Sequence, residues 1–169
     1  MEFDVPRWAL AISYWIHLLA TVIWLGGLVT MTVVAWPAVR NRLLDSEQWS
    51  TLQKRFTPLA NASLVLLWIT GFLQMTSDPN YEGFLAISSL WAQALLIKHI
   101  AVIGMMVFGL AIQWRIQPAL ARLAILEEKQ PAAAAEEKAN LVQQEFRLLR
   151  INLVFAVAVL FFTAVATAI

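Results

Sequence analysis

The sequence contains no cysteine and carries little charge. The absence of cysteine excludes disulfide bonds, thiolate metal sites and thiol catalysis. Charged residues make up only 14 % of the 169 residues, whereas soluble domains average about 25 %. Hydrophobic residues make up 60 %, so water is not the main solvent of this chain. The formal net charge of +1 favours neither a nucleic-acid-binding protein nor an acidic tail.

Four apolar segments are each long enough to cross a bilayer, which takes about 20 mostly apolar residues. They cover residues 8–36, 58–75, 85–114 and 151–169. Each is expected to be a helix, because an open strand in lipid would leave its backbone groups unpaired. The predicted fold class is therefore an all-α integral membrane protein, a single domain over residues 1–169 with four transmembrane helices in an antiparallel bundle. Residues 115–150 are more polar and are expected to extend the last two helices as a charged cytoplasmic hairpin.

Lysine and arginine gather in two of the three connections between these segments. The first connection holds four of the 12 and the third holds six, whereas the second holds none. Because basic connections stay in the cytoplasm, both termini are predicted to lie outside. We expect a multi-pass protein of the bacterial inner membrane, with the lipid bilayer as its main partner and no nucleic-acid partner.

The only two histidines, His17 and His99, both fall inside predicted membrane spans. An ionisable side chain in a span is costly and is a functional candidate by default. His17 follows Trp8 by nine residues, and His99 follows Trp91 by eight. If these tryptophans mark the outer surface, both imidazoles lie about 12–14 Å inside it, at 1.5 Å per residue. Two histidines at one depth of a helical bundle are suited to ligate one haem b iron.

Three interpretations of the histidines are open. The two ligate one haem together, or one of them holds a metal or a haem alone, or each only hydrogen-bonds across the bundle. The equal depth requires the third helix to begin near Trp91. A start at Gly83 would place His99 deeper than His17.

Four further residues are candidates for contact with a haem. Trp24 lies on the helical stripe of His17, and Gly27 removes side-chain bulk beside it, although close helix packing is the commoner role of glycine in a span. Arg7 and Lys98 are candidates to pair with haem propionates, and Lys98 is equally able to extend to the outer surface.

Copper is the alternative metal, because methionine thioethers suit Cu(I). Methionine in an apolar helix usually serves packing, so this interpretation is the weaker one from the residues alone. The candidates are Met31, Met75, Met105 and Met106. The sequence has no Gly-rich phosphate loop, no HExxH and no Ser-His-Asp set, and no catalytic residue is predicted.

Short motifs resemble the copper-resistance protein D (CopD) family. His17 is followed seven residues later by Trp24-Leu25-Gly26-Gly27, as in the opening helix of that family. Residues 55–59 (RFTPL) leading to Thr70-Gly71 are similar to its second helix, and Lys98 opens a helix that resembles its third. The resemblance implies a membrane protein of copper import or copper homeostasis.

The first-helix pattern also occurs in the HemJ family of protoporphyrinogen oxidases, small four-helix membrane proteins that bind haem b. That resemblance implies that His17 is a haem ligand and Lys98 the matching basic residue. The Pro-Arg-Leu of HemJ is replaced here by Trp36-Pro37-Ala38, and its Asn-Glu-x-Pro by residues 150–153 (RINL). HemJ-type oxidase activity is therefore disfavoured, and the chain stands nearer to CopD.

The leading hypothesis from the sequence is a CopD-like, b-type haem protein in electron transfer. Iron held by His17 and His99 has no open position for oxygen, and a quinol or a redox partner protein would exchange its electrons. Two alternatives are a copper import or homeostasis protein, and a non-catalytic subunit of a larger membrane complex or homo-oligomer. The sequence leaves open whether the protein is an enzyme.

Overall fold

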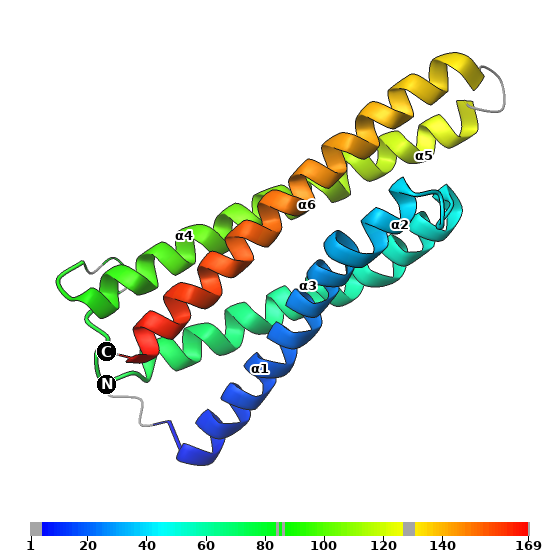
Figure 1. Ribbon diagram of the computed structural model, residues 1–169. Helices are drawn as coiled ribbons and strands as arrows, with labels where there is room; N and C mark the ends of the chain where they lie inside the picture. Colours follow the sequence, from blue (N-terminus) through cyan, green and yellow to red (C-terminus); the bar gives the residue numbers. More distant parts are fainter. Residues whose placement is uncertain (1–4, 84, 86, 127–130, 169) are drawn as a thin grey trace. The chain divides into compact units, whose positions relative to one another are not determined.

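The computed structural model describes residues 5–83, 85, 87–126 and 131–168, whose regular structure is entirely helical (Figure 1). This confirms the all-α fold class. The elements in chain order are α1 (Arg7–Val29), η1 (Thr30–Ala35), α2 (Trp36–Arg40), α3 (Ser46–Thr76), α4 (Leu90–Ala111), η2 (Ile112–Ile116), α5 (Gln117–Leu126) and α6 (Pro131–Ala168), where η marks a π-helical segment.

Four helical stretches are long and apolar enough to cross a membrane. They run over Arg7–Arg40, Glu47–Thr76, Leu90–Leu123 and Ala134–Ala168. Large apolar side chains such as Trp8, Ile69 and Phe161 are exposed on these helices. Exposed apolar surface of this extent indicates a lipid surrounding rather than water.

Two helices begin at different residues from the predicted spans, because polar side chains cap them. Asp45 accepts a hydrogen bond from the backbone N–H of Gln48, whose side chain accepts one from the backbone of Asp45. This capping box starts α3 well before the predicted residue 58. Ser89 accepts from the backbone N–H of Ala92, so α4 begins at Leu90 rather than at residue 85.

The described helices form two compact units, one within residues 1–96 and one within residues 97–168. In the first unit, α1, η1 and α2 run without a break and pack antiparallel to α3 (Figure 1). The buried face of α1 recurs at helical spacing and consists of Ser13, Ala20, Trp24 and Leu28. The turn to α3 contains Arg42, with a φ of 58°.

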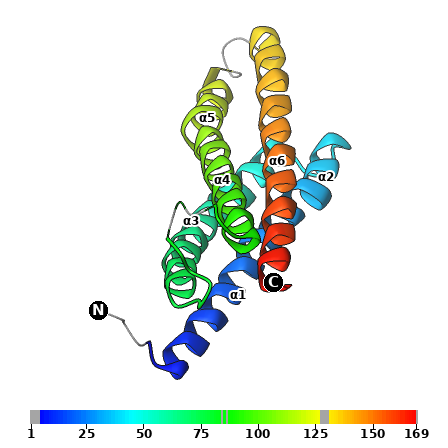
Figure 2. The same cartoon turned by 90° about the vertical axis from the view of Figure 1, so that its left-hand side faces the viewer.

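In the second unit, α4 from Ile97 onward, η2 and α5 form one long helix beside α6 (Figure 2). The rings of Phe108 on α4 and Phe155 on α6 stack with centroids 5.8 Å apart. Gly104 makes room for Phe155, since a Cβ there would lie 3.3 Å from its ring. The polar residues predicted as a hairpin lie on α5 and on the first part of α6, and residues 127–130 between them fall outside the described residues.

Both π-helical segments precede a proline. Trp36 N–H bonds to Met31 O, and Gln117 N–H bonds to Ile112 O, five residues back in each case. Proline in a regular helix clashes with the carbonyl four residues earlier. Pro37 and Pro118 would meet carbonyls inside η1 and η2, so the wider π turn accommodates each ring and the helix continues.

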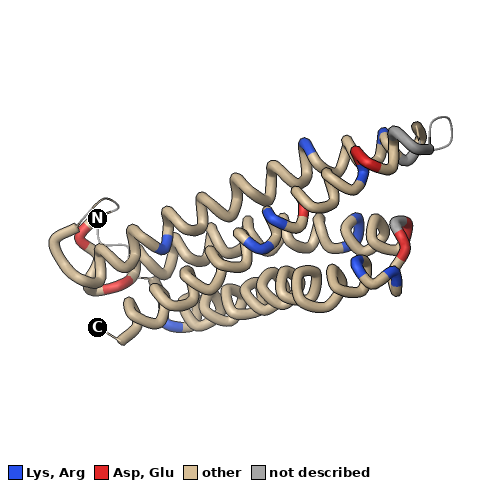
Figure 3. Tube along the Cα trace, turned by 45° about the horizontal axis from the view of Figure 1, so that its top comes forward, with Lys and Arg blue, Asp and Glu red and all other residues tan. Residues whose placement is uncertain are grey.

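Most lysine and arginine residues lie toward one end of each unit, near the turn between α2 and α3 and along α5 and the first part of α6, with Arg7 and Lys98 as the exceptions (Figure 3). This matches the charge pattern read from the sequence. The outside location of the termini and the single-domain organisation stay predictions.

Candidate functional site

His17 lies on α1, ten residues after Arg7, and its imidazole faces α3. Its Nδ1 lies 2.8 Å from Oγ1 of Thr70. The Thr70 side chain is buried, with 6 % of the residue surface exposed, and its hydroxyl donates to the carbonyl of Leu66 at 2.6 Å. One membrane-span histidine is therefore held across the first unit by a buried hydroxyl.

Gly71 completes the support for this ring. A Cβ at Gly71 would lie 3.4 Å from Cε1 and 3.9 Å from Nδ1 of His17. The absence of a side chain therefore lets the imidazole lie directly against the backbone of α3. We call His17, Thr70 and Gly71 the histidine seat.

Two more polar side chains tie the seat together. Ser13, one turn before His17 on α1, donates to the backbone carbonyl of Thr70 at 3.4 Å. Gln74, one turn after Thr70 on α3, donates through Nε2 to the Ser13 hydroxyl at 3.3 Å. Interhelical hydrogen bonds of this kind hold membrane helices in register, and here they fix the face of α3 that His17 meets.

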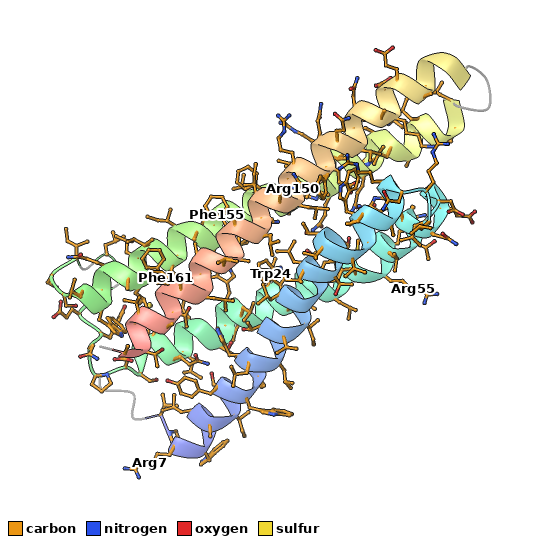
Figure 4. All side chains as sticks on the ribbon, viewed as in Figure 1. Arg7, Trp24, Arg55, Arg150, Phe155 and Phe161 are labelled. Atoms are coloured by element: carbon orange, nitrogen blue, oxygen red, sulfur yellow. The ribbon has the colours of Figure 1, made fainter. Side chains whose placement is uncertain are left out.

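The other residues of α1 that were predicted to contact a haem each lie in a different environment. Trp24 is buried in the last third of α1, and Arg7 is exposed at its beginning (Figure 4). The space beside Gly27 is occupied by the ring of Phe56 from α3. The glycine therefore serves close helix packing at this point.

His99 and Lys98 lie on α4, in the second unit, and both are half-buried. His99 follows Leu90, the first residue of its helix, by nine residues. α4 begins next to Trp91, as the interpretation of the two histidines from the sequence required of this helix. Their joint ligation of one iron stays a prediction.

Buried methionines are spread over three helices. Met31 in η1, Met75 on α3 and Met105 on α4 are each less than a tenth exposed. Within the described part of the chain, no three His, Asp or Glu side chains form a group that could hold a metal ion. The candidate donors for a soft metal, taken from the sequence, are imidazole and thioether groups.

Sequence reasoning did not pair Thr70 with His17. It counted Thr70 and Gln74 among the residues that hydrogen-bond between helices, which the structure confirms, but α3 carries several hydroxyl residues and the sequence does not say which one meets His17. The helical spacing of Ser13 and His17 on α1, and of Thr70 and Gln74 on α3, is the signal that could have found the pairing.

A comparison with known protein families shows which family the chain belongs to. A family described as Copper resistance protein D matches residues 50–166. The chain belongs to the CopD family. The match covers α3 to α6, including Thr70, Gly71 and His99, and begins after α1. No curated protein and no solved structure matches the chain. As a CopD member with four apolar helices, it is a multi-pass membrane protein related to copper resistance.

Proposed function

We propose that this CopD protein takes part in copper import, with His17 as a ligand for the copper ion as it crosses the membrane. The observation that carries the proposal is the histidine seat, in which an imidazole inside a membrane span is oriented by Thr70 and by the bare backbone of Gly71. Imidazole nitrogen is a good copper ligand, and membership of the family supports copper as the cargo.

Thioethers would supply the softer ligands that Cu(I) prefers. Met75 is the candidate nearest to the seat along the chain, because it lies one helical turn after Gly71 on α3 and is buried. Both groups are uncharged donors, and so neither adds a buried charge to the span.

The test is copper uptake into lipid vesicles that contain purified protein and enclose a Cu(I) indicator. Wild-type protein should raise uptake above empty vesicles, and His17→Ala should lower it by more than about 10-fold, since a lost ligand costs at least as much as a lost supporting contact. Gly26→Ala is the control, because open space surrounds that position. Uptake no faster than in empty vesicles would refute the proposal.

Haem b electron transfer is the second candidate function. His17 lies ten residues after the first residue of α1, and His99 nine after the first residue of α4, about 14–15 Å along each helix at 1.5 Å per residue. Each histidine thus lies at a similar distance along its own helix, and imidazole suits haem iron, so His17 and His99 are the proposed axial ligands. Lys98 and Arg7 would pair with the propionates. The bound haem would supply one-electron transfer.

A visible spectrum of the purified protein separates the two candidates. A Soret band with split α and β bands supports haem, and its loss or change to a high-spin spectrum in both His17→Ala and His99→Ala supports ligation by two histidines. A colourless protein that binds copper excludes the haem candidate. If the protein holds neither copper nor haem, both proposals fail and a scaffolding subunit is favoured.

A further inference from the structure

The Thr70 hydroxyl makes two close contacts with only one hydrogen. Its Oγ1 lies 2.6 Å from the carbonyl oxygen of Leu66 and 2.8 Å from Nδ1 of His17. Both distances are those of hydrogen bonds, so a proton must lie in each contact. A threonine hydroxyl supplies one donor and accepts through its lone pairs.

The two protons can be assigned from the chemistry of the partners. A carbonyl oxygen has no hydrogen to donate, so the Thr70 proton must point at Leu66 O. A threonine on a helix commonly bonds the carbonyl four residues back in this way. The proton in the other contact therefore belongs to Nδ1 of His17, which donates to Thr70. In the neutral imidazole the lone pair is then on Nε2.

We infer that Thr70 is a positioning residue that sets the tautomer of His17 and presents Nε2 as the metal-binding nitrogen. This inference rests on the proposed function for the presence of a metal. A copper ion and a haem iron are both transition-metal centres that accept an imidazole nitrogen, so the inference covers either one. Metal-binding histidines usually donate their second ring N–H to a fixed oxygen. Thr70 supplies that oxygen without placing a charge in the span.

The surroundings of Thr70 hold it in place for this role. Ser13 donates to its backbone carbonyl, and Gln74 donates to Ser13. The imidazole has Thr70 on its Nδ1 side and Gly71 against Cε1, so neighbouring residues of one helix fix both the hydrogen bond and the position of the ring.

Nitrogen-15 NMR of the metal-free protein, labelled at histidine, tests the tautomer directly. A His99→Gln variant assigns the His17 signals. Wild type and Thr70→Ser should show a protonated Nδ1 and an unprotonated Nε2, whereas Thr70→Val, of the same shape without the hydroxyl, should lose this pattern. Thr76→Val is the matched control, because Thr76 on the same helix also donates to the carbonyl four residues back. A protonated Nε2 in wild type, or an unchanged pattern in Thr70→Val, overturns the inference.

Titration with Cu(I), and with haem in a parallel sample, tests the consequence for binding. Thr70→Val should weaken the affinity for the bound metal centre by about 10- to 100-fold, and Thr70→Ser should restore it. If wild type binds a metal centre and Thr70→Val binds it with the same affinity, the positioning role of Thr70 is overturned. If wild type binds neither metal centre but shows the expected NMR pattern, the proposed function fails while the assignment of the tautomer to Thr70 is supported.

Discussion

Gly26 and Gly27 are neighbours on α1 with different surroundings. A Cβ at Gly27 would fall on the Phe56 ring, whereas Gly26 has no atom within 4 Å of that position. We predict that Gly27→Ala lowers the free energy of unfolding by about 1–3 kcal/mol, because the ring or the helix must shift. Gly26→Ala should cause no loss, since alanine favours the helix. Unfolding in detergent measures both, and equal stability of the two variants would contradict the packing at Gly27.

The importance of His17 can be inferred from the sequence, whereas that of Thr70 cannot. A histidine in an apolar span is rare, and the cost of placing it there marks it as functional. A threonine in a span has many ordinary uses, since α3 also carries Thr57 and Thr76. Only the rotation of α3 about its axis decides which hydroxyl meets His17, and that rotation depends on packing along the whole helix.

The helices were predictable from the sequence, but not their ends. An apolar run marks the part of a helix that lies in lipid, whereas Asp45 and Ser89 start α3 and α4 within polar segments through side-chain caps. The π turns were not predictable, because one extra residue per turn leaves the apolar pattern almost unchanged. Each π-helical segment contains the carbonyl four residues before a proline, which explains its position once the structure is known.

The two units repeat one order of features along their first helices. A histidine is followed ten residues later by a glycine that faces the second helix of the unit, then by a π-helical segment and a proline. These residues are His17, Gly27 and Pro37 in the first unit, and His99, Gly109 and Pro118 in the second. The two histidines thus hold equivalent positions in their own units, which is consistent with a common role.

Asn152 on α6 places a polar side chain in the interior of the second unit. It is 6 % exposed, and its Oδ1 has no hydrogen-bond partner among the described residues. An unpaired buried acceptor costs about 1–3 kcal/mol. We therefore predict that Asn152→Leu, of similar size, leaves the free energy of unfolding unchanged or raises it by about 1 kcal/mol. Detergent unfolding measures the change, with exposed Asn140→Leu as control. A clear loss of stability in Asn152→Leu alone would show that the amide has a partner.

We predict the orientation of the whole chain from its distribution of charge. Residues 40–55 around the turn from α2 to α3 hold four basic residues, whereas the connection after α3 carries only acidic charges, Asp78 and Glu82. A phosphatase that is active only outside the cytoplasm should therefore work when fused after Asn80 and fail when fused after Leu43. The opposite pattern of activity would place the termini in the cytoplasm.

For the whole molecule, we propose that this CopD protein binds copper through His17, a histidine inside a membrane span. The family match, which covers residues 50–166, supports copper as the cargo. The histidine seat supports His17 as the ligand, through contacts with Thr70 and Gly71 that lie within the first unit.

The most direct measurement is a Cu(I) titration of the purified protein in detergent, against a coloured chelator that competes for the ion. Wild type should withdraw copper from the chelator, and His17→Ala should withdraw it with an affinity lower by more than about 10-fold, while Gly26→Ala behaves as wild type. Copper affinity that is the same in wild type and His17→Ala, or the failure of wild type to withdraw any copper, would contradict the account.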